Sequence, residues 1–114
     1  MTTRTAFLPQ YWPIRVAGFS TDGEERSDNP VQTDVAGFCC FTDDLITKDA
    51  LLPKMEPNDY VVVFDTGAYY FNNHYDYNSL PRVAVYSAET TVSGLELTLI
   101  RRAETLADIV RNMS

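Results

Sequence analysis

The residues best suited to chemistry gather in one short stretch, Gly37–Asp44 (GFCCFTDD), which holds both cysteines and a pair of aspartates. A thiol can act as a nucleophile or a proton donor, and a carboxylate beside it can hold a substrate or a cation. Two later stretches, Asp65–Tyr69 (DTGAY) and Tyr77–Arg82 (YNSLPR), contain polar and aromatic residues that could line the same site. We therefore expect one composite site built from three segments.

The cysteine pair admits several interpretations. Neighbouring side chains on an extended strand point to opposite faces, so one cysteine is expected in the core and the other at a surface or cleft. A buried cysteine would be a small hydrophobic residue without a chemical role. Cys40 would form a nucleophile pair with His74 if the fold brought them together. A zinc site from Cys39, Cys40 and His74 is disfavoured, because adjacent cysteines diverge and no CxxC spacing is present, so we predict no metal.

The acidic residues and the glycine-containing stretch also have two interpretations each. Asp43 and Asp44 could bind a divalent cation together with Asp65, or they could form a solvated turn. Gly67 and Tyr69 could present a backbone N–H and a phenol hydroxyl to an anion such as a phosphate. The alternative is a strand-end turn with a packed tyrosine. In Tyr77–Arg82, the polar side chains favour a structural corner that holds the loop.

The totals exclude several classes of protein. The chain has 114 residues and a net charge of −7, which argues against nucleic acid or an anionic membrane as a partner. No stretch is apolar for long enough to cross a bilayer, and the N-terminus does not have the pattern of a signal peptide. Two adjacent cysteines do not make a disulfide framework. We expect a cytoplasmic protein with a single domain spanning residues 1–114.

Hydrophobic periodicity predicts mostly β structure. The seven Tyr and six Phe favour strands. Strands are expected at Tyr11–Phe19, Gln32–Phe41, Tyr60–Phe64, Arg82–Ala88 and Leu95–Ile100, with Tyr60–Phe64 as a buried central strand. Ser20–Pro30 should be an exposed loop, Leu45–Leu52 is mixed, and Leu51–Asp59 should turn with Asn58 at positive φ. Leu106, Ile109, Val110 and Met113 predict one amphipathic C-terminal helix. The fold class is therefore a β-barrel or sandwich with a terminal helix.

The order of these motifs resembles the C-terminal β-domain of the fold-type III pyridoxal phosphate-dependent amino-acid decarboxylases, the diaminopimelate and ornithine decarboxylase group. Gly37–Asp44 is similar to the family's Gly-Pro-x-Cys-Glu-Ser-x-Asp motif, and Leu52–Asp59 (LPKMEPND) to its Leu-Pro-acid-Pro-Gly-Asp turn. The family's Asp-x-Gly-Ala-Tyr, Tyr-Asn-x-Arg-Pro-Arg and Arg-Arg-x-Glu-Thr motifs resemble Asp65–Tyr69, Tyr77–Arg82 and Arg101–Thr105. The resemblance implies a Greek-key-like fold of the type found in the C-terminal domain of alanine racemase.

The resemblance also implies roles for individual residues. Cys40 would reach across a dimer interface and donate a proton to the carbanion left after carbon dioxide departs. Tyr69, with Gly67 beside it, would bind the phosphate of pyridoxal 5'-phosphate. Asp44 would lie on the substrate side of the loop, and so would Phe41. The cofactor itself would act as the electron sink.

Two departures from the family pattern qualify these roles. Phe41 stands where the family usually has Glu or Asp, and a phenyl ring cannot accept a charge-assisted hydrogen bond from the distal ammonium of a diamino acid. An amino-acid substrate without a distal ammonium is therefore favoured. Leu80 replaces an Arg of the pattern.

The family's (β/α)8 barrel, which carries the cofactor-binding lysine and phosphate loop over about 250 residues, has no counterpart here, since the two lysines Lys48 and Lys54 lie in no matching motif. We therefore expect a fragment or one subunit of a split enzyme, inactive alone, that needs a barrel domain or subunit and forms a homodimer or hetero-oligomer. Two alternatives stay open: a non-catalytic dimerisation or interaction module derived from that fold, and a partner similar to alanine racemase.

Overall fold

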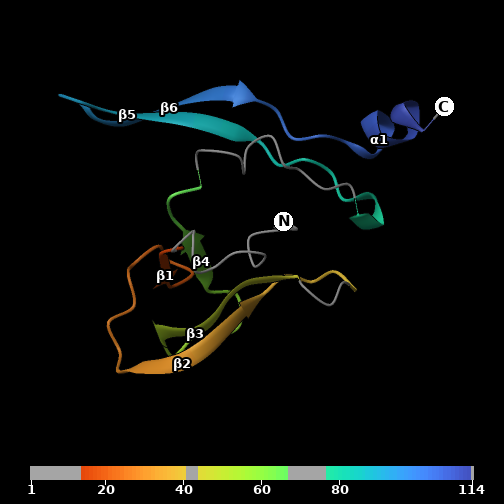
Figure 1. The fold of residues 1–114 in the computed structure, drawn as a ribbon. Helices are drawn as coiled ribbons and strands as arrows, with labels where there is room; N and C mark the ends of the chain where they lie inside the picture. The colour runs from red at the N-terminus through yellow and green to blue at the C-terminus, as the bar shows by residue number, and fades with distance from the viewer. Residues whose placement is uncertain (1–13, 41–43, 67–76, 114) are drawn as a thin grey trace. The chain divides into compact units, whose positions relative to one another are not determined.

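The computed structural model describes residues 14–40, 44–66 and 77–113. These fall into two compact units, the first with the described residues of Thr2–Tyr75 and the second with those of Asp76–Ser114. The first unit carries strands β1 (Val16–Phe19), β2 (Pro30–Ala36), β3 (Leu45–Pro53) and β4 (Tyr60–Val63). The second carries the 3-10 turn η2 (Tyr77–Ser79), strands β5 (Val85–Thr91) and β6 (Gly94–Arg101), and helix α1 (Leu106–Asn112) (Figure 1). The predicted class, mostly strands with one C-terminal helix, is confirmed.

In the first unit the strands pair in two antiparallel couples. β1 pairs with β4, and Val16 lies opposite Val63. β2 and β3 form a hairpin that runs from the pair Pro30 and Pro53 to the pair Ala36 and Leu45. A bulge follows Thr33, where Asp34 Oδ1 accepts a hydrogen bond of 2.9 Å from the backbone N–H of Asp49. The register is therefore defined at both ends of the hairpin, and Gly37–Cys40 and Asp44 lie at its tip, between the two strands.

One strand prediction in this unit is wrong in its extent, and one strand was not predicted. The strand predicted over Gln32–Phe41 ends at Ala36, because Gly37 closes the hairpin loop with Asp44 and the cysteines follow as bends. The stretch Leu45–Leu52, which has a mixed pattern, lies in strand β3 because it pairs with β2, with two register shifts. Cross-strand pairing here overrides the weak local pattern.

The first unit buries little. Among the described residues, Leu52 is the only hydrophobic side chain that is buried, at 1% exposure. The predicted buried strand Tyr60–Phe64 exists as β4, but Tyr60 is 58% exposed and its neighbours Val61 and Val62 are also exposed, so the prediction of burial is wrong for this chain. A strand with apolar residues on both faces needs cover on both faces, and within the described residues β4 pairs with β1 alone.

The second unit is a hairpin followed by a capped helix. β5 and β6 are joined by a tight turn in which Thr91 lies opposite Gly94, and Gly94 has a φ of 121°, a conformation open to glycine. β5 begins later than the predicted Arg82–Ala88 strand, because the backbone of Arg82 pairs with Glu104 instead. The predicted last strand and terminal helix are confirmed as β6 and α1. Asn58, in the first unit, has the predicted positive φ of 75°.

Candidate functional site

The Gly37–Asp44 loop is closed by two hydrogen bonds that converge on one residue. The backbone N–H of Gly37 donates to the carbonyl oxygen of Asp44 at 2.6 Å. The backbone N–H of Cys39 donates to Asp44 Oδ2 at 2.9 Å. Asp44 is 4% exposed and, when whole residues are compared, is the only buried charged residue among those that the structure describes. The carboxylate therefore lies against the backbone that leads into the cysteine pair, and the solvated-turn interpretation does not hold for Asp44.

The two cysteines differ in exposure, although they do not lie on a strand. Cys39 is half-buried and Cys40 is exposed. The expectation that one cysteine faces the interior and the other a surface is met in this weaker form, but its stated reason, alternation along an extended strand, is wrong because β2 has already ended. An exposed thiol at a hairpin tip can reach a group supplied by another domain.

The remaining predicted site residues lie outside the described part of the chain. Phe41, which was assigned to the substrate side, falls in the gap 41–43, and Gly67 and Tyr69 fall in the gap 67–76. His74, the proposed partner of a nucleophile or zinc site, lies in the same gap. Their predicted roles stay predictions.

The segment that leads into Gly67 and Tyr69 begins at a well-held residue, Asp65. Arg15 Nε donates to Asp65 Oδ2 at 2.6 Å and Arg15 Nη2 donates to Asp65 Oδ1 at 3.0 Å, a bidentate pair. The Arg15 guanidinium also lies 5.2 Å from the centre of the Phe64 ring. These hydrogen bonds hold the pKa of the Asp65 carboxyl below its ordinary value and raise that of Arg15. The pair fixes the end of β4 to the residue before β1.

Asp65 is therefore engaged by an arginine, which leaves little support for the cation site suggested for Asp43, Asp44 and Asp65. In the described ranges, no group of three or more His, Cys, Asp or Glu side chains is placed so that it could hold a metal ion.

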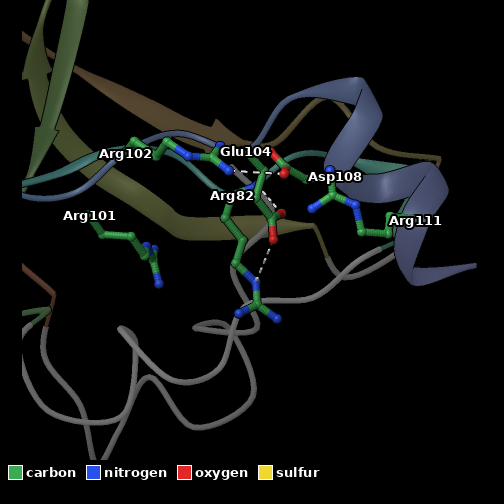
Figure 2. A pocket seen from close by; sticks show the side chains of 6 residues that line it. All are labelled: Arg82, Arg101, Arg102, Glu104, Asp108 and Arg111. Carbon is green, nitrogen blue, oxygen red and sulfur yellow. Dashed lines mark hydrogen bonds and ion pairs between the residues drawn. The ribbon is translucent and has the colours of Figure 1, made fainter.

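The second unit contains a pocket of about 290 Å³ lined by charged side chains: Arg82, Arg101, Arg102, Glu104, Asp108 and Arg111 (Figure 2). Arg102 donates two hydrogen bonds to Asp108, from Nη1 to Oδ2 at 2.7 Å and from Nη2 to Oδ1 at 2.9 Å. Arg82 and Glu104 exchange two further bonds, because each backbone N–H donates to the other residue, at 2.9 Å in both cases. Arg82 Nε also lies 3.7 Å from Glu104 Oε1, so carboxylates of the pocket itself pair with two of its guanidinium groups.

Asp108 also caps the helix. The N–H of Asp108 donates to Thr105 Oγ1 at 3.3 Å, and the N–H of Thr105 donates to Asp108 Oδ2 at 2.9 Å, a reciprocal capping box at the start of α1. The Arg102 guanidinium and the two Thr105 donors hold the pKa of Asp108 well below its ordinary value. The Arg101–Thr105 motif therefore has a structural use here, joining the end of β6 to α1. The structural role predicted for Arg82 fits the same network.

Two structurally important features were not found by sequence reasoning. Arg26 and Asp59 form an ion pair in which Arg26 Nη2 donates to Asp59 Oδ1 at 2.9 Å and the Asp59 side chain is 3% exposed. Gly37 leaves room for the Asp44 carboxylate, since a Cβ built on Gly37 would lie within contact distance of all three carboxylate atoms. Of these residues, only Gly37 could have been singled out from the sequence, because it is the first residue of the Gly37–Asp44 motif. Nothing near Arg26 in the sequence points to Asp59.

Comparisons with known proteins agree on one family. Residues 2–67 match the model of the pyridoxal-dependent decarboxylase C-terminal sheet domain. Diaminopimelate decarboxylase of Methanothermobacter thermautotrophicus is 33% identical over 112 residues, which is 97% of this chain and 24% of the relative. Diaminopimelate decarboxylase of Bacillus subtilis is 38% identical over 77 residues, 68% of this chain and 17% of the relative. The chain thus spans about a quarter or less of the length of these curated relatives.

Solved structures give the same result. A crystal structure of diaminopimelate decarboxylase superposes with a TM-score of 0.74 at 26% identity, covering 96% of this chain and 27% of the other. A diaminopimelate decarboxylase structure from M. jannaschi gives a TM-score of 0.69 at 25% identity, covering 94% and 23%. Within the part of the chain that the structure describes, no helix is long and apolar enough to cross a membrane.

Proposed function

Because this chain belongs to the pyridoxal-dependent decarboxylase family, as its C-terminal sheet domain, we propose that it forms the sheet domain of a pyridoxal phosphate-dependent amino-acid decarboxylase. It would work with a (β/α)8 barrel domain or subunit, in the same polypeptide or in another, and the assembly would be a homodimer or hetero-oligomer. The single observation that carries this proposal beyond family membership is the exposed Cys40 thiol at the tip of the β2–β3 hairpin.

The role proposed for Cys40 is proton donation. When bound, pyridoxal phosphate supplies the electron sink for the carbon that loses carbon dioxide. The Cys40 Sγ–H bond breaks, its proton goes to that carbon, and the thiolate takes a proton back from solvent. A thiol suits this step because its pKa lies near enough to neutrality to be tuned by its surroundings. The exposure of Cys40 lets the sulfur reach a substrate that another domain holds.

The role proposed for Tyr69 and Gly67 is to hold the cofactor phosphate. The phenol hydroxyl of Tyr69 and a backbone N–H beside Gly67 are donors of the type that an anionic phosphate accepts. Support comes from Asp65, which Arg15 fixes by two hydrogen bonds immediately before this segment. Anchoring Asp65 fixes the point from which the chain enters this segment. Lys54 pairs with Glu56 at 3.3 Å, which suits a surface role better than cofactor attachment.

The substrate proposal is an amino acid that is not recognised through a distal ammonium at position 41. The relatives are named diaminopimelate decarboxylases, and diaminopimelate carries such an ammonium. Phe41 offers an apolar face at the position where the family usually has an acid. Either Phe41 has shifted the substrate class, or another residue reads the ammonium.

The test is to purify the chain together with its barrel domain or subunit, load the protein with pyridoxal phosphate, and measure carbon dioxide release. The substrates offered are diaminopimelate, lysine, ornithine and a panel of amino acids with apolar side chains. We expect carbon dioxide release, with the apolar panel preferred. Strong preference for a diamino acid would overturn the role given to Phe41 and leave the decarboxylase proposal intact. A cofactor-loaded complex that decarboxylates none of them would favour the non-catalytic dimerisation module instead.

A further inference from the structure

The Asp44 carboxylate has surroundings that a substrate-binding group would not have. Asp44 is 4% exposed, and Oδ2 accepts the hydrogen bond of the Cys39 N–H at 2.9 Å. Oδ1 is buried and has no hydrogen-bond donor. A carboxylate that contacts substrate needs at least one oxygen open to the site, whereas both oxygens of Asp44 are enclosed by the protein. Burying a carboxylate with an unpaired oxygen costs free energy, so the fold keeps Asp44 inside the loop in spite of this cost.

Gly37, at the other end of the loop, leaves the space that the Asp44 carboxylate occupies. A Cβ at this position would overlap the three carboxylate atoms of Asp44, so any other residue would have to displace them. Gly37 does not have a positive φ, unlike Gly23 and Gly94. The glycine is therefore needed for space and not for an unusual backbone conformation. The two residues at the ends of the loop are matched to each other.

We propose that Asp44 is a positioning residue for Cys40, acting through the Cys39 backbone N–H, and that Gly37 makes this possible by leaving room for the carboxylate. The bond from Cys39 N to Asp44 Oδ2 fixes the Phe38–Cys39 peptide, one residue before Cys40. Fixing that peptide restricts the directions in which the next residue, Cys40, can leave the loop. This inference rests on the proposed function, because it takes Cys40 as the group that acts on the substrate.

The kinetic test compares Asp44→Ala with Asp44→Asn in the complex with the barrel domain. The alanine variant loses the acceptor for Cys39 N–H, so we expect kcat to fall by about tenfold to a hundredfold, the usual result of a misplaced reacting group. KM should stay within about twofold, because no substrate contact is removed. The asparagine variant keeps an acceptor oxygen of the same size, and its kcat should return to within about threefold of the parent. A raised KM in both variants would identify Asp44 as a substrate contact and overturn the proposal.

A second variant tests the same idea without removing the carboxylate. Gly37→Ala should lower kcat as Asp44→Ala does, because its Cβ displaces the acceptor. In the Asp44→Ala background the space is already open, so Gly37→Ala should add little further loss, a non-additivity that marks two residues acting as one unit. Additive losses in the double variant would contradict the proposed mechanism.

A direct readout on the chain separates this inference from the proposed function. Amide hydrogen exchange by NMR should show that the Cys39 N–H is protected in the parent and exchanges at least about tenfold faster in Asp44→Ala. The matched control is Asp34→Ala, which removes an exposed carboxylate that also accepts a backbone N–H, that of Asp49. It should leave Cys39 exchange unchanged. If Cys39 is protected through Asp44 but Cys40→Ala does not affect decarboxylation, the proposed function fails. Unprotected Cys39 with an essential Cys40 would refute the positioning role alone.

Discussion

Asp44 and Asp108 are two aspartates in different units of the molecule, and they differ in how completely their carboxylate oxygens are hydrogen-bonded. Asp108 is paired on every side, by the fork of Arg102 and by the backbone and hydroxyl of Thr105. Asp44 is more deeply buried, yet only one of its oxygens has a donor, and the loop it closes carries an exposed thiol. Saturated hydrogen bonding is typical of a group that holds structure. A buried carboxylate with an unpaired oxygen calls for an explanation other than stability, and the exposed thiol in the same loop offers one.

The largest effect is expected at the thiol. Cys40→Ala should lower decarboxylation by the barrel complex by about 10²–10⁴-fold, because a positioned proton donor contributes that much. The free energy of unfolding of the chain should be nearly unchanged, since Cys40 is exposed. Activity assays and urea unfolding of the same preparation measure both. The control is Cys39→Ala; if it were the more damaging of the two, the assignment of the donor would move to Cys39.

The next effect tests where the first unit obtains its stability. Leu52→Ala should reduce the free energy of unfolding by about 2–5 kcal/mol, because it leaves a cavity at a buried site. Leu52 pairs with Val31 in the hairpin that carries the Cys40 loop. The matched control is Leu97→Ala on β6, a side chain that is 62% exposed, and its cost should stay near or below about 0.5 kcal/mol. Equal losses in urea unfolding would mean that the hairpin β5–β6 is covered in solution.

A smaller effect is expected at the start of α1. Thr105→Ala should reduce the free energy of unfolding by about 1 kcal/mol, the usual cost of losing an N-cap. Thr105→Ser keeps the hydroxyl and should lose much less. Decarboxylation should be unchanged at temperatures where the chain is folded, and a kinetic defect in Thr105→Ala would break the distinction drawn between the two aspartates.

The smallest effect is a dependence of stability on pH. The folded-state pKa of Asp108, Asp59 and Asp65 is lowered by their arginine partners. Groups of this kind contribute stability above the unfolded pKa of about 3.9, and the contribution is lost as pH falls through the folded pKa. Unfolding measured between neutral pH and strongly acidic pH should therefore show stability falling at the acid end. Arg102→Gln should flatten part of that slope, and an unchanged slope would show that the Arg102 pair contributes nothing measurable.

The sequence predicted best those features of the fold that depend on residues close together in the chain. The apolar spacing of Leu106, Ile109 and Val110 predicted α1 correctly, and Asn58 was placed correctly at positive φ because both depend on neighbouring residues. The position of the Cys40 loop was found from its residue types and motif. Its conformation was not found, because the sequence pattern predicts a strand as far as Phe41, whereas the closing hydrogen bond joins Gly37 to Asp44. The burial of Asp44 depends on the same closure.

Contacts between residues far apart in the chain could not be predicted from the sequence, for a physical reason. The pairing of Arg26 with Asp59 and of Arg15 with Asp65 joins residues far apart in sequence, and neither side of either pair has a local pattern that requires the other. The exposure of β4 could not be predicted either. Its apolar residues indicate that other residues should pack against both faces of the strand. They do not indicate whether those residues belong to this chain or to another one.

The closure of the β2–β3 hairpin at Gly37 and Asp44 has a consequence for protein engineering. Since the ends of the loop are joined to each other, the residues between them form a cassette whose replacement leaves the register of Ala36 opposite Leu45 intact. A cassette taken from a relative, with Gly37 and Asp44 retained, should leave the pairing of the two strands as it is.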